Sequence, residues 1–381
     1  MINTLRQLPK APVGLHMIKK NILLDAREFI GAKNTGIGRF LEGLVDCLAE
    51  ALASAKIVLL SPDEKKIPSA LSNRNNVVFR RISGSFLKSE INLSNLTWQG
   101  ADIFISPYPK LPLFGTFCPS VNTIHDVLDL THPAYKKRSK VFFDRFRIKT
   151  ALKRADLTWY DSKSSLQATD ALLGLVGRKP RVRFPAIDEA FNSAGRENED
   201  AILDKYHLKR GYILVVGNGL PHKNLGVLLK ISNRLTRQPV FVGIPRPNMI
   251  FWQKKFPGVD TIWINHVSDH DLPVIMRNAY CLAQPSTAEG YGYPPLEAMA
   301  CGVPAIVSNI PVLVESTGGN ALIADPHSSD TWLESFLMLE DEYKYQAQVA
   351  SGLKWVGPLK SPQGWTSHLS DIEQLLEANE T

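Results

Sequence analysis

Residues Ser286–Asn309 read STAEGYGYPPLEAMACGVPAIVSN, and this stretch decides how the rest of the chain is interpreted. It begins with a glycine-bearing loop, Glu289 to Gly292, that carries a carboxylate. We expect a helix to begin at Pro294-Pro295 and to stop at Gly302, because proline suits the first helical position and glycine the residue beyond the last turn. The apolar residues 303–307 then predict a strand. Loop–helix–strand units of this kind hold ligands at the edge of a parallel sheet.

The two carboxylates of this stretch, Glu289 and Glu297, are separated by the predicted helix start. Glu289 is therefore expected to reach from the loop. Glu297 is expected in the first helical turn, where the positive end of the helix dipole favours a negative charge. An ordinary loop carboxylate and ordinary helix-start electrostatics remain the alternative explanations of these two acids.

Length and composition indicate a soluble protein with two domains. The 381 residues exceed what one hydrophobic core usually fills, and a hydrophobic content of 44% with 21% charged residues is ordinary for globular proteins. No run of apolar residues is long enough to span a membrane, and the N-terminal residues lack the apolar region of a secretory signal. The four cysteines are widely spaced, which argues against a metal site and favours a reducing cytoplasm. They are Cys47, Cys118, Cys281 and Cys301.

Short apolar runs alternate with helical patterns from end to end, which predicts an α/β fold with parallel sheets. The alternation restarts after the polar linker RENEDAILDKYHLKRG, so we predict a domain boundary near Ser193. The predicted domains are residues 1–193 and 194–358, followed by a helical segment at 359–381. Strands are expected at Asn21–Ala26, Lys56–Ser61, Val77–Arg80, Ala101–Ser106, Val121–His125, Leu157–Asp161, Gly211–Gly217, Pro239–Gly243, Thr261–Asn265, Tyr280–Gln284, Val303–Ser308 and Ala321–Ala324.

A glycine pair, Gly36 and Gly38, follows the first predicted strand and opens a long helix that contains Phe40, Leu44 and Leu48. Glycine lets the backbone approach a ligand closely, and a helix N-terminus favours an anion. A simple strand-to-helix turn explains the same pattern equally well.

His125 and Asp126 come at the end of an apolar strand in the first half. Ligands of open α/β sheets bind outside the carboxyl ends of the strands, so these two side chains are expected at a crevice. A histidine there could donate a hydrogen bond to a sugar hydroxyl or to a developing negative charge. The alternative is a loop histidine that binds only backbone groups.

A second glycine loop follows the buried strand at residues 213–216 and contains Asn218, His222 and Lys223. A glycine loop, a lysine and the start of an amphipathic helix together suggest a phosphate clamp. The loop lacks the GK[ST] ending of a Walker loop and the GxGxxG of a dinucleotide site. Lys223 as a plain surface lysine remains the alternative.

Ser268-Asp269-His270-Asp271 has the appearance of a metal-binding sequence. However, Ser268 begins a helical pattern and Asp271 lies three residues on, which is close to the pattern of a helix cap. No other group of histidine, cysteine and aspartate supports a metal, so we expect a helix cap and no metal site.

The positive charge of the chain is concentrated between Lys136 and Arg154, where nine residues are basic and one is acidic. Net charge is +7, which indicates an anionic partner. Apolar residues are interleaved, and an amphipathic helix would place them largely on one side. The helix either packs that side on its own domain, or contacts an anionic membrane surface or lipid diphosphate. Nucleic acid is not expected, because no recognition module accompanies the charge. The interleaved residues are Val141, Phe142, Phe146, Ile148 and Leu152.

Taken together, these segments resemble the retaining glycosyltransferases of family 4, whose GT-B fold has two Rossmann-like domains facing across a cleft. The specific signature is Glu289-x7-Glu297 within EGYGYPPLEAMACGVPAI, and the resemblance covers all but about the first twenty residues. It implies that the last helix crosses back to the N-terminal domain. The other matching segments are Thr35-Gly36-Ile37-Gly38-Arg39, His125-Asp126, Gly217 with Lys223-Asn224, and Val267-Ser268-Asp269.

The resemblance also implies roles. Glu297 would bind the ribose hydroxyls of a sugar nucleotide, and Glu289 the hydroxyls of the donor sugar. Lys223 would bind the diphosphate, helped by amides near Gly38, and His125 would face the transferred sugar. Many relatives have an arginine shortly before the lysine, whereas this loop offers Asn218 and His222, so either His222 or a basic residue elsewhere is expected to assist. The further donor-binding residues expected by position are Gly36, Val267, Gly290, Tyr291, Gly292 and Tyr293, and those expected to bind the acceptor are Asp126, Lys136, Lys137 and Arg138.

Family resemblance further implies retention at the anomeric carbon, with no metal and no cofactor besides the sugar nucleotide. The segment IHDVLDLTHPAY is similar to those of bacterial mannosyl- and rhamnosyltransferases, so GDP-mannose is the favoured donor and UDP- or dTDP-sugars are alternatives. A polyprenyl-diphosphate-linked glycan is the expected acceptor, in O-antigen-like or lipopolysaccharide synthesis. The protein would then be cytoplasmic or peripheral at the inner face of the membrane.

Three other classes of protein are alternatives to a glycosyltransferase. An NAD oxidoreductase would need a GxGxxG with an acid about twenty residues later, which is missing. A sugar-nucleotide epimerase on the same fold would act without an acceptor. A non-catalytic glycan- or lipid-binding relative would have no reason to keep Glu289, Glu297 and Lys223.

Overall fold

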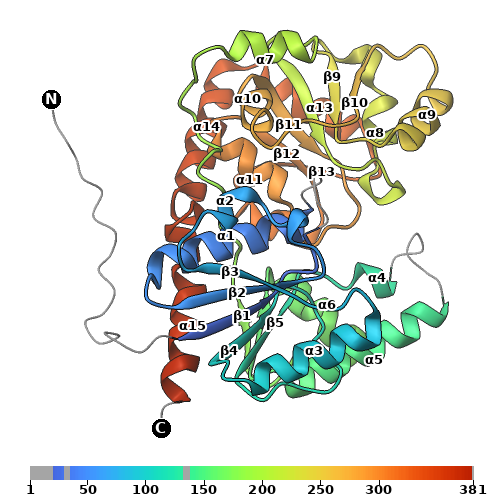
Figure 1. The fold of residues 1–381 in the computed structure, drawn as a ribbon. Coiled ribbons are helices and arrows are strands. Elements are labelled where there is room, and N and C mark those ends of the chain that lie inside the picture. The colour runs from blue at the N-terminus through green and yellow to red at the C-terminus, as the bar shows by residue number, and fades with distance from the viewer. Residues whose placement is uncertain (1–19, 30–34, 132–137, 380–381) are drawn as a thin grey trace, which may run out of the picture.

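The structure is a computed structural model that describes residues 20–29, 35–131 and 138–379, with only the backbone described for residues 138–140. Two α/β domains lie one above the other, and the C-terminal helices run down one side of both (Figure 1). The helices are α1 (Gly36–Ala51), α2 (Ser69–Ser72), α3 (Phe86–Trp98), α4 (Leu128–Thr131), α5 (Arg138–Arg154), α6 (Lys163–Leu173), α7 (Glu199–Lys205), α8 (Gly226–Leu229), α9 (Arg246–Lys255), α10 (Leu272–Arg277), α11 (Tyr293–Ala300), α12 (Pro311–Ser316), α13 (Ser329–Leu339), α14 (Glu342–Val356) and α15 (Thr366–Ala378).

The N-terminal domain is built on a seven-stranded parallel sheet with the order β3-β2-β1-β4-β5-β6-β7. The strand order reverses between β1 and β4, which is the switch point where open α/β sheets bind ligands. The strands are β1 (Asn21–Asp25), β2 (Lys56–Ser61), β3 (Val77–Arg81), β4 (Ile103–Ser106), β5 (Ser120–Ile124), β6 (Leu157–Tyr160) and β7 (Pro180–Val182).

The C-terminal domain has a six-stranded parallel sheet with the order β10-β9-β8-β11-β12-β13, and its order reverses between β8 and β11. Both sheets have hydrophobic clusters of buried residues on their faces, as parallel sheets require. The strands are β8 (Tyr212–Val216), β9 (Pro239–Val242), β10 (Ile262–Ile264), β11 (Ala279–Gln284), β12 (Ala305–Ser308) and β13 (Leu322–Ala324).

The last helix, α15, packs on the N-terminal domain although it follows the C-terminal domain in sequence. Ile372 and Leu376 are buried in the same cluster as residues of β1 and α1. The indole Nε1 of Trp159 in β6 donates to Asp371 at 2.9 Å, and Arg183 forms an ion pair with the same carboxylate at 2.8 Å. The predicted GT-B arrangement, with its C-terminal helix crossing back, is therefore confirmed.

Every strand expected from the sequence is present within a few residues, but β7 was missed. It contributes three residues at the edge of the sheet, too few to show a pattern. The change of sheet falls between β7 and β8, in the segment that contains the predicted boundary at Ser193, and the boundary residue itself stays a prediction.

Two helix predictions need correction. The helix expected after Lys223 is broken into the four-residue α8 and a 3-10 turn at Ser232–Arg234, although its leucines are buried as expected. Helix α11 begins at Tyr293, so Glu297 lies in its second turn rather than its first. Gly302 follows the end of α11 with a positive φ of 75°, as the predicted helix stop requires.

Within the described ranges, no helix is both long enough and apolar enough to cross a membrane.

Candidate functional site

Lys223 and Glu289 meet at the carboxyl edge of the C-terminal sheet. Lys223 ends the 3-10 turn Pro221–Lys223 after β8, and Glu289 lies in the loop after β11, the two strands at the switch point. The lysine Nζ donates to the two carboxylate oxygens at 2.7 and 2.9 Å. Lys223 and Glu289, which were predicted to bind the diphosphate and the sugar of one donor, thus form an ion pair with each other.

Two polar neighbours hold the Glu289 carboxylate in its charged form. Ser286 Oγ donates to its Oε1 at 2.6 Å, and the side-chain amide of Gln284 donates to the same oxygen. Burial by itself would raise the pKa of Glu289, but Lys223 and these hydrogen bonds outweigh burial and lower the pKa below its usual range. Glu289 is therefore a preorganised acceptor of hydrogen bonds.

The loop around Lys223 is fixed by Asn224, which has a positive φ of 52°. Its side-chain amide donates to the carbonyls of Pro285 and Pro326 at 3.0 and 2.7 Å. The predicted donor residue His222 is buried, and its carbonyl accepts from Thr287 N at 2.8 Å. Since α8 has only four residues, Lys223 rather than a helix terminus supplies the positive charge of this loop.

Glu297 pairs with a residue from the other domain, Arg39. Glu297 is 2% exposed, and its Oε1 accepts from Arg39 Nη1, which lies in the first turn of α1. The guanidinium also lies over the ring of Tyr293, 5.4 Å from its centroid. Burial raises the pKa of Glu297, and Arg39 offsets that effect only in part. Thr35 caps the N-terminus of α1, and its side chain accepts from Gly38 N at 2.9 Å.

Gly290 lies where the two domains meet. A Cβ at Gly290 would lie 2.7 Å from Asp126 Oδ2, so only glycine fits against that carboxylate. Ser165 of α6 bridges the same junction, donating to His125 O at 2.6 Å and lying 3.2 Å from Gly290 O. The predicted residues Asp126 and Gly290 are therefore neighbours, and burial raises the pKa of Asp126.

His125 is held on both sides by acceptors of its own domain. Its Nδ1 lies 2.6 Å from Asp161 Oδ2, and its Nε2 lies 2.7 Å from the carbonyl oxygen of Pro107. Because a carboxylate and a carbonyl only accept, these two neighbours favour a hydrogen on each ring nitrogen, that is, the imidazolium form. Burial would lower the pKa of His125, but Asp161 raises it beyond that effect. In this state His125 is no general base.

A further contact between the domains is made by Glu315 of α12, which accepts hydrogen bonds from the first turn of α6. The amides of Lys163 and Ser164 donate to its two oxygens at 2.6 and 2.9 Å. A carboxylate from the C-terminal domain thereby caps a helix of the N-terminal domain.

Several buried polar atoms at this junction have no hydrogen-bond partner in the structure. Buried polar groups are normally satisfied, so such a group at a cleft indicates room for a ligand or water. Tyr291 and Tyr293 are neighbours, with ring centroids 5.3 Å apart. The atoms concerned are Glu297 Oε2, Tyr291 Oη, Tyr293 Oη and Asp161 Oδ1.

The remaining predicted residues are less informative. Gly292 has a positive φ of 90° before α11, Val267 lies in the core, and Asn218 Oδ1 accepts from Leu220 N at 3.1 Å. Lys136 and Lys137 lie outside the described residues, as does the side chain of Arg138.

The helix cap predicted at Ser268 needs correction, because the N-cap residue of α10 is Asp271, which makes no side-chain cap hydrogen bond. Ser268 instead lies in the turn before the helix, where its Oγ accepts from Asp271 N at 3.1 Å. The carboxylate of Asp271 binds Lys205 at 2.7 Å and Tyr206 at 2.8 Å. Among the described residues there is no group of histidine, cysteine and carboxylate side chains that could hold a metal ion.

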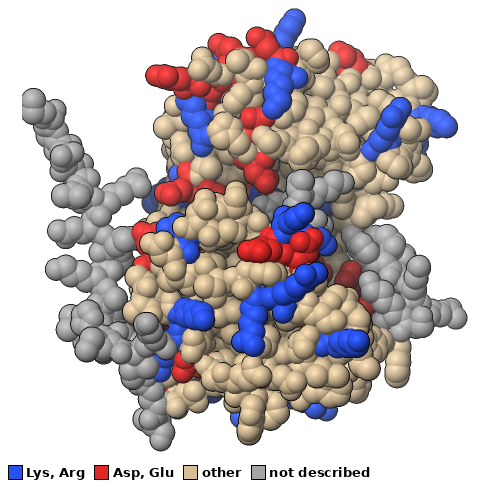
Figure 2. Space-filling model, in the orientation of Figure 1, with Lys and Arg blue, Asp and Glu red and all other residues tan. Residues whose placement is uncertain are grey.

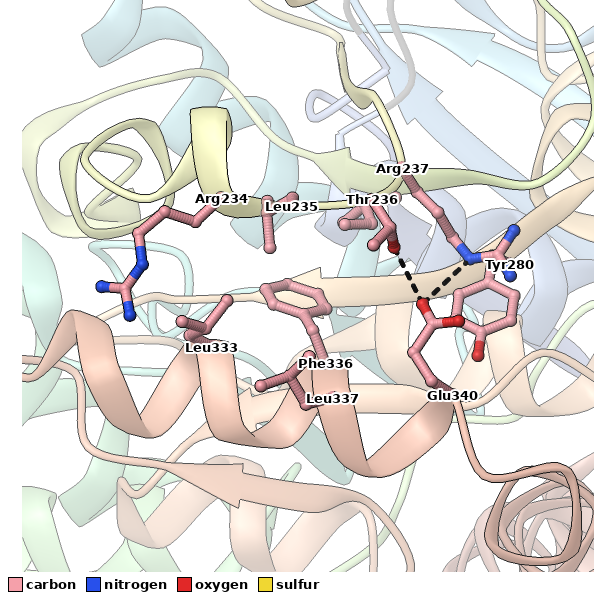
Figure 3. A pocket seen from close by; sticks show the side chains of 10 residues that line it. Arg234, Leu235, Thr236, Arg237, Tyr280, Leu333, Phe336, Leu337 and Glu340 are labelled. Atoms are coloured by element: carbon pink, nitrogen blue, oxygen red, sulfur yellow. Dashed lines mark hydrogen bonds and ion pairs between the residues drawn. The ribbon is translucent and has the colours of Figure 1, made fainter.

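Another pocket lies at the opposite edge of the C-terminal sheet (Figure 3). It is lined by Ile213 and Tyr280, at the amino ends of β8 and β11, and by α13. Arg237 lies over the Tyr280 ring at 3.5 Å, and Thr236 Oγ1 donates to Glu340 at 2.9 Å. Because these residues lie at the amino ends of the strands, the pocket is separate from the site at the carboxyl edge.

Three residues of the site were not predicted: Arg39, Asp161 and Glu315. Arg39 stands in the quoted motif TGIGR, and Asp161 ends a predicted strand, so both had a weak signal. Glu315 had none, because its partner is a helix terminus of the other domain.

Parts of the chain are similar to known proteins. Residues 197–353 match the family model described as glycosyl transferases group 1. The chain is 28% identical to O-antigen chain mannosyltransferase B of Escherichia coli, over 87% of this chain and 94% of that protein.

Solved structures share the fold. Sucrose-phosphate synthase from Thermosynechococcus elongatus superposes with a TM-score of 0.75 at 15% identity, covering 94% of this chain and all of that one. The Anabaena protein HepE, in complex with UDP-glucose, has a TM-score of 0.72 at 16% identity, with 93% and 99% covered. The predicted resemblance to GT-B glycosyltransferases and bacterial O-antigen mannosyltransferases is confirmed.

Proposed function

We propose, on the premise that residues 197–353 form a glycosyl transferases group 1 domain, that the chain transfers a hexose from a sugar nucleotide to a glycan with retention of anomeric configuration. The observation that carries this proposal is the Lys223–Glu289 ion pair at the switch point of the C-terminal sheet, facing Asp126 of the other domain through Gly290. A cation and a hydrogen-bond acceptor side by side suit a diphosphate next to a sugar.

On binding, the donor would separate this ion pair. The diphosphate would take over Lys223, and the sugar hydroxyls would donate to Glu289, which Ser286 and Gln284 keep in place. Neither side chain is left buried without a partner after this exchange, so the step costs little. The ribose hydroxyls would donate to Glu297, whose Oε2 has no hydrogen-bond partner in the structure.

Arg39 is then the basic residue that replaces the second cation of many relatives. It belongs to the N-terminal domain, but its guanidinium already reaches Glu297. When ribose hydroxyls occupy Glu297, Arg39 is free to turn toward the diphosphate beside the amides at Gly38. The developing negative charge of the leaving group would thus be stabilised from both domains.

In the chemical step we propose that the bond from the anomeric carbon to the leaving diphosphate oxygen breaks through an oxocarbenium-like state. The acceptor hydroxyl attacks from the same face, and the leaving diphosphate takes its proton. His125 does not take that proton, because both of its nitrogens already carry hydrogen; it contributes a fixed positive charge and a rigid wall. No metal is required in this scheme, because cationic side chains bind the diphosphate.

GDP-mannose is the donor that we propose, and an O-antigen-like glycan on a polyprenyl diphosphate is the acceptor. Similarity to an O-antigen chain mannosyltransferase over most of the chain supports mannose as the sugar and an O-antigen-like glycan as the acceptor. A UDP- or dTDP-sugar is the second candidate, since the structural neighbour HepE binds UDP-glucose. The protein would then act on the cytoplasmic side of the membrane.

The test is incubation of the purified protein with GDP-mannose, UDP-glucose and dTDP-rhamnose, each with detergent-solubilised polyprenyl-diphosphate glycans and with EDTA present. Mass spectrometry and NMR of the product would report the sugar and its anomeric configuration. We expect an α-linked mannose. Inversion, a requirement for metal, or conversion of the sugar nucleotide without an acceptor would each contradict the proposal.

A further inference from the structure

Helices α3 and α5 of the N-terminal domain present a large apolar surface to solvent. Among the described residues, nine of the fifteen exposed large hydrophobic side chains lie on these two helices or on the loop at residues 111–118. The most exposed are Phe142 at 78% and Trp98 at 72%. Soluble proteins rarely expose so many large apolar side chains together without a partner. We call this surface the α3–α5 face; its most exposed members are Leu87, Trp98, Phe114, Phe117, Phe142 and Phe146.

The α3–α5 face is continuous. The two helices lie side by side in Figure 1 and are joined by the buried ion pair of Arg147 with Glu90 at 2.8 Å. At one end the rings of Phe86 and Phe143 are 6.0 Å apart, and at the other Trp98 meets Phe117 at 5.0 Å. Aromatic contacts therefore link α3 both to α5 and to the loop.

This arrangement corrects the expectation for α5. The apolar residues of its sequence do not lie on one side: Ile148 and Leu152 are buried, whereas Phe142 and Phe146 point outward. With 3.6 residues per turn, Phe142, Phe146, Lys149 and Lys153 fall on one outer stripe. Aromatic and basic side chains thus share the same surface.

The exposed charges of the α3–α5 face are all of one sign. The acids of these helices, Glu90 and Asp144, are buried and paired with Arg147 and Lys110. This part of the N-terminal domain appears in Figure 2 as mainly tan with separate blue side chains. Within residues 86–98 and 141–154, the exposed charged side chains are Lys88, Arg145, Lys153 and Arg154.

We propose that the α3–α5 face docks on the surface of an anionic phospholipid bilayer, with Phe142, Phe146 and Trp98 in the interface between headgroups and acyl chains. Amphipathic aromatic rings and basic side chains are the combination that binds such surfaces. A second copy of the chain does not fit, because two copies of this face would bring like charges together.

Docking through the α3–α5 face would also bring the candidate site close to the membrane surface. Helix α4 begins two residues after Asp126 and packs on α5, so the loop that faces the donor lies next to the membrane-bound helix. A glycan carried by a lipid diphosphate would reach the cleft without leaving the membrane. The inference deepens the proposed function, since it names the surface that presents the lipid-linked acceptor.

The test is sedimentation of the full chain, without any sugar nucleotide, with vesicles of phosphatidylcholine alone or mixed with phosphatidylglycerol. We expect binding only to the mixed vesicles. Phe142→Ser with Phe146→Ser should lower the partition coefficient at every salt concentration. Lys149→Ser with Lys153→Ser should lower it about tenfold or more at low salt, because each basic residue near an anionic surface contributes on the order of 1 kcal/mol. That second effect should vanish at high salt.

The matched control is Phe251→Ser with Lys254→Ser on α9, an exposed aromatic and basic pair of the C-terminal domain. It should bind vesicles like the wild type. Three results would overturn the inference. The control could lose as much vesicle binding as the α5 variants, or the wild type could fail to bind vesicles. The wild type could also self-associate in a way that Phe142→Ser with Phe146→Ser abolishes. If the protein transfers the sugar in detergent but does not bind vesicles, the proposed function stands and only docking through the α3–α5 face is ruled out.

Discussion

The two ion pairs of the site, Lys223–Glu289 and Arg39–Glu297, differ in what holds them. The first lies within one domain, between loops that follow neighbouring strands of one sheet. The second joins helix α1 of the N-terminal domain to α11 of the C-terminal domain. The first therefore exists whether the domains are open or closed, whereas the second requires closure. Under the proposed function, the first pair would be preorganised to bind the sugar and diphosphate, and the second would form only when the domains close.

The largest effect is expected from Lys223→Ala. Loss of the cation beside the leaving group should lower kcat by about 10² to 10³-fold, the usual consequence of removing one group that stabilises a developing charge. It also leaves Glu289 buried without its cation, so the pKa of that carboxyl should rise. Steady-state kinetics with the donor identified by the panel measures the change.

Lys230→Ala is the control for this change, because Lys230 is exposed on the same segment of chain and lies outside the site. It should retain full activity. A Lys223→Ala protein that turns over as fast as the control would remove Lys223 from the diphosphate site.

Arg39→Ala should have the next largest effect, on KM for the sugar nucleotide as well as on kcat. A hydrogen bond to a charged group contributes about 1.5 to 3 kcal/mol, which corresponds to about a tenfold to hundredfold loss of affinity. Isothermal titration with the nucleoside diphosphate alone measures it.

Arg39→Lys separates charge from shape, because lysine keeps the charge but lacks the planar fork that binds two acceptors. Arg39→Lys is therefore expected to recover part of the nucleotide affinity and of the kcat that Arg39→Ala loses. If Arg39→Ala binds the nucleotide as tightly as the wild type, the pair between domains is structural and the second cation lies elsewhere.

Asp161→Asn tests the charge state of His125. Since the folded pKa of His125 is raised above its usual 6.5, the pair stabilises the protein fully below about pH 6.5, and that stability is lost as pH rises through the raised pKa. In the variant this pH-dependent part of the free energy of unfolding should disappear.

The measurement is denaturant unfolding of both proteins across this range, with NMR titration of the imidazole. The two curves should converge at high pH, where the wild-type imidazolium has lost its proton. Parallel curves, with an unchanged histidine titration, would show that Asp161 does not hold the proton on His125.

Glu315→Ala should have the smallest effect. It removes the carboxylate that caps α6 from the other domain, and losing a cap costs about 1 kcal/mol of stability. Small-angle scattering should also show a more open average arrangement of the domains. Glu334→Ala, at an exposed acid of α13, is the control, and equal scattering from both variants would exclude Glu315 as a contact that favours closure.

Sequence patterns alone predicted two α/β halves, the helix α1 with its apolar residues, a helical C-terminal segment, and the loops that carry Lys223, Glu289 and His125. These features depend on periodicity and on turn residues within a few positions, which any sequence displays directly. The short β7 and the broken helix after Lys223 escaped, because three or four residues do not establish a period.

Tertiary structure alone decided the partners. Lys223 binds Glu289, His125 binds Asp161 and Arg39 binds Glu297, across 66, 36 and 258 residues of sequence. It also turned Phe142 outward while Ile148 packs inward. Such pairings follow from which strands are neighbours in a sheet and how two domains close. A single sequence carries no local signal of either.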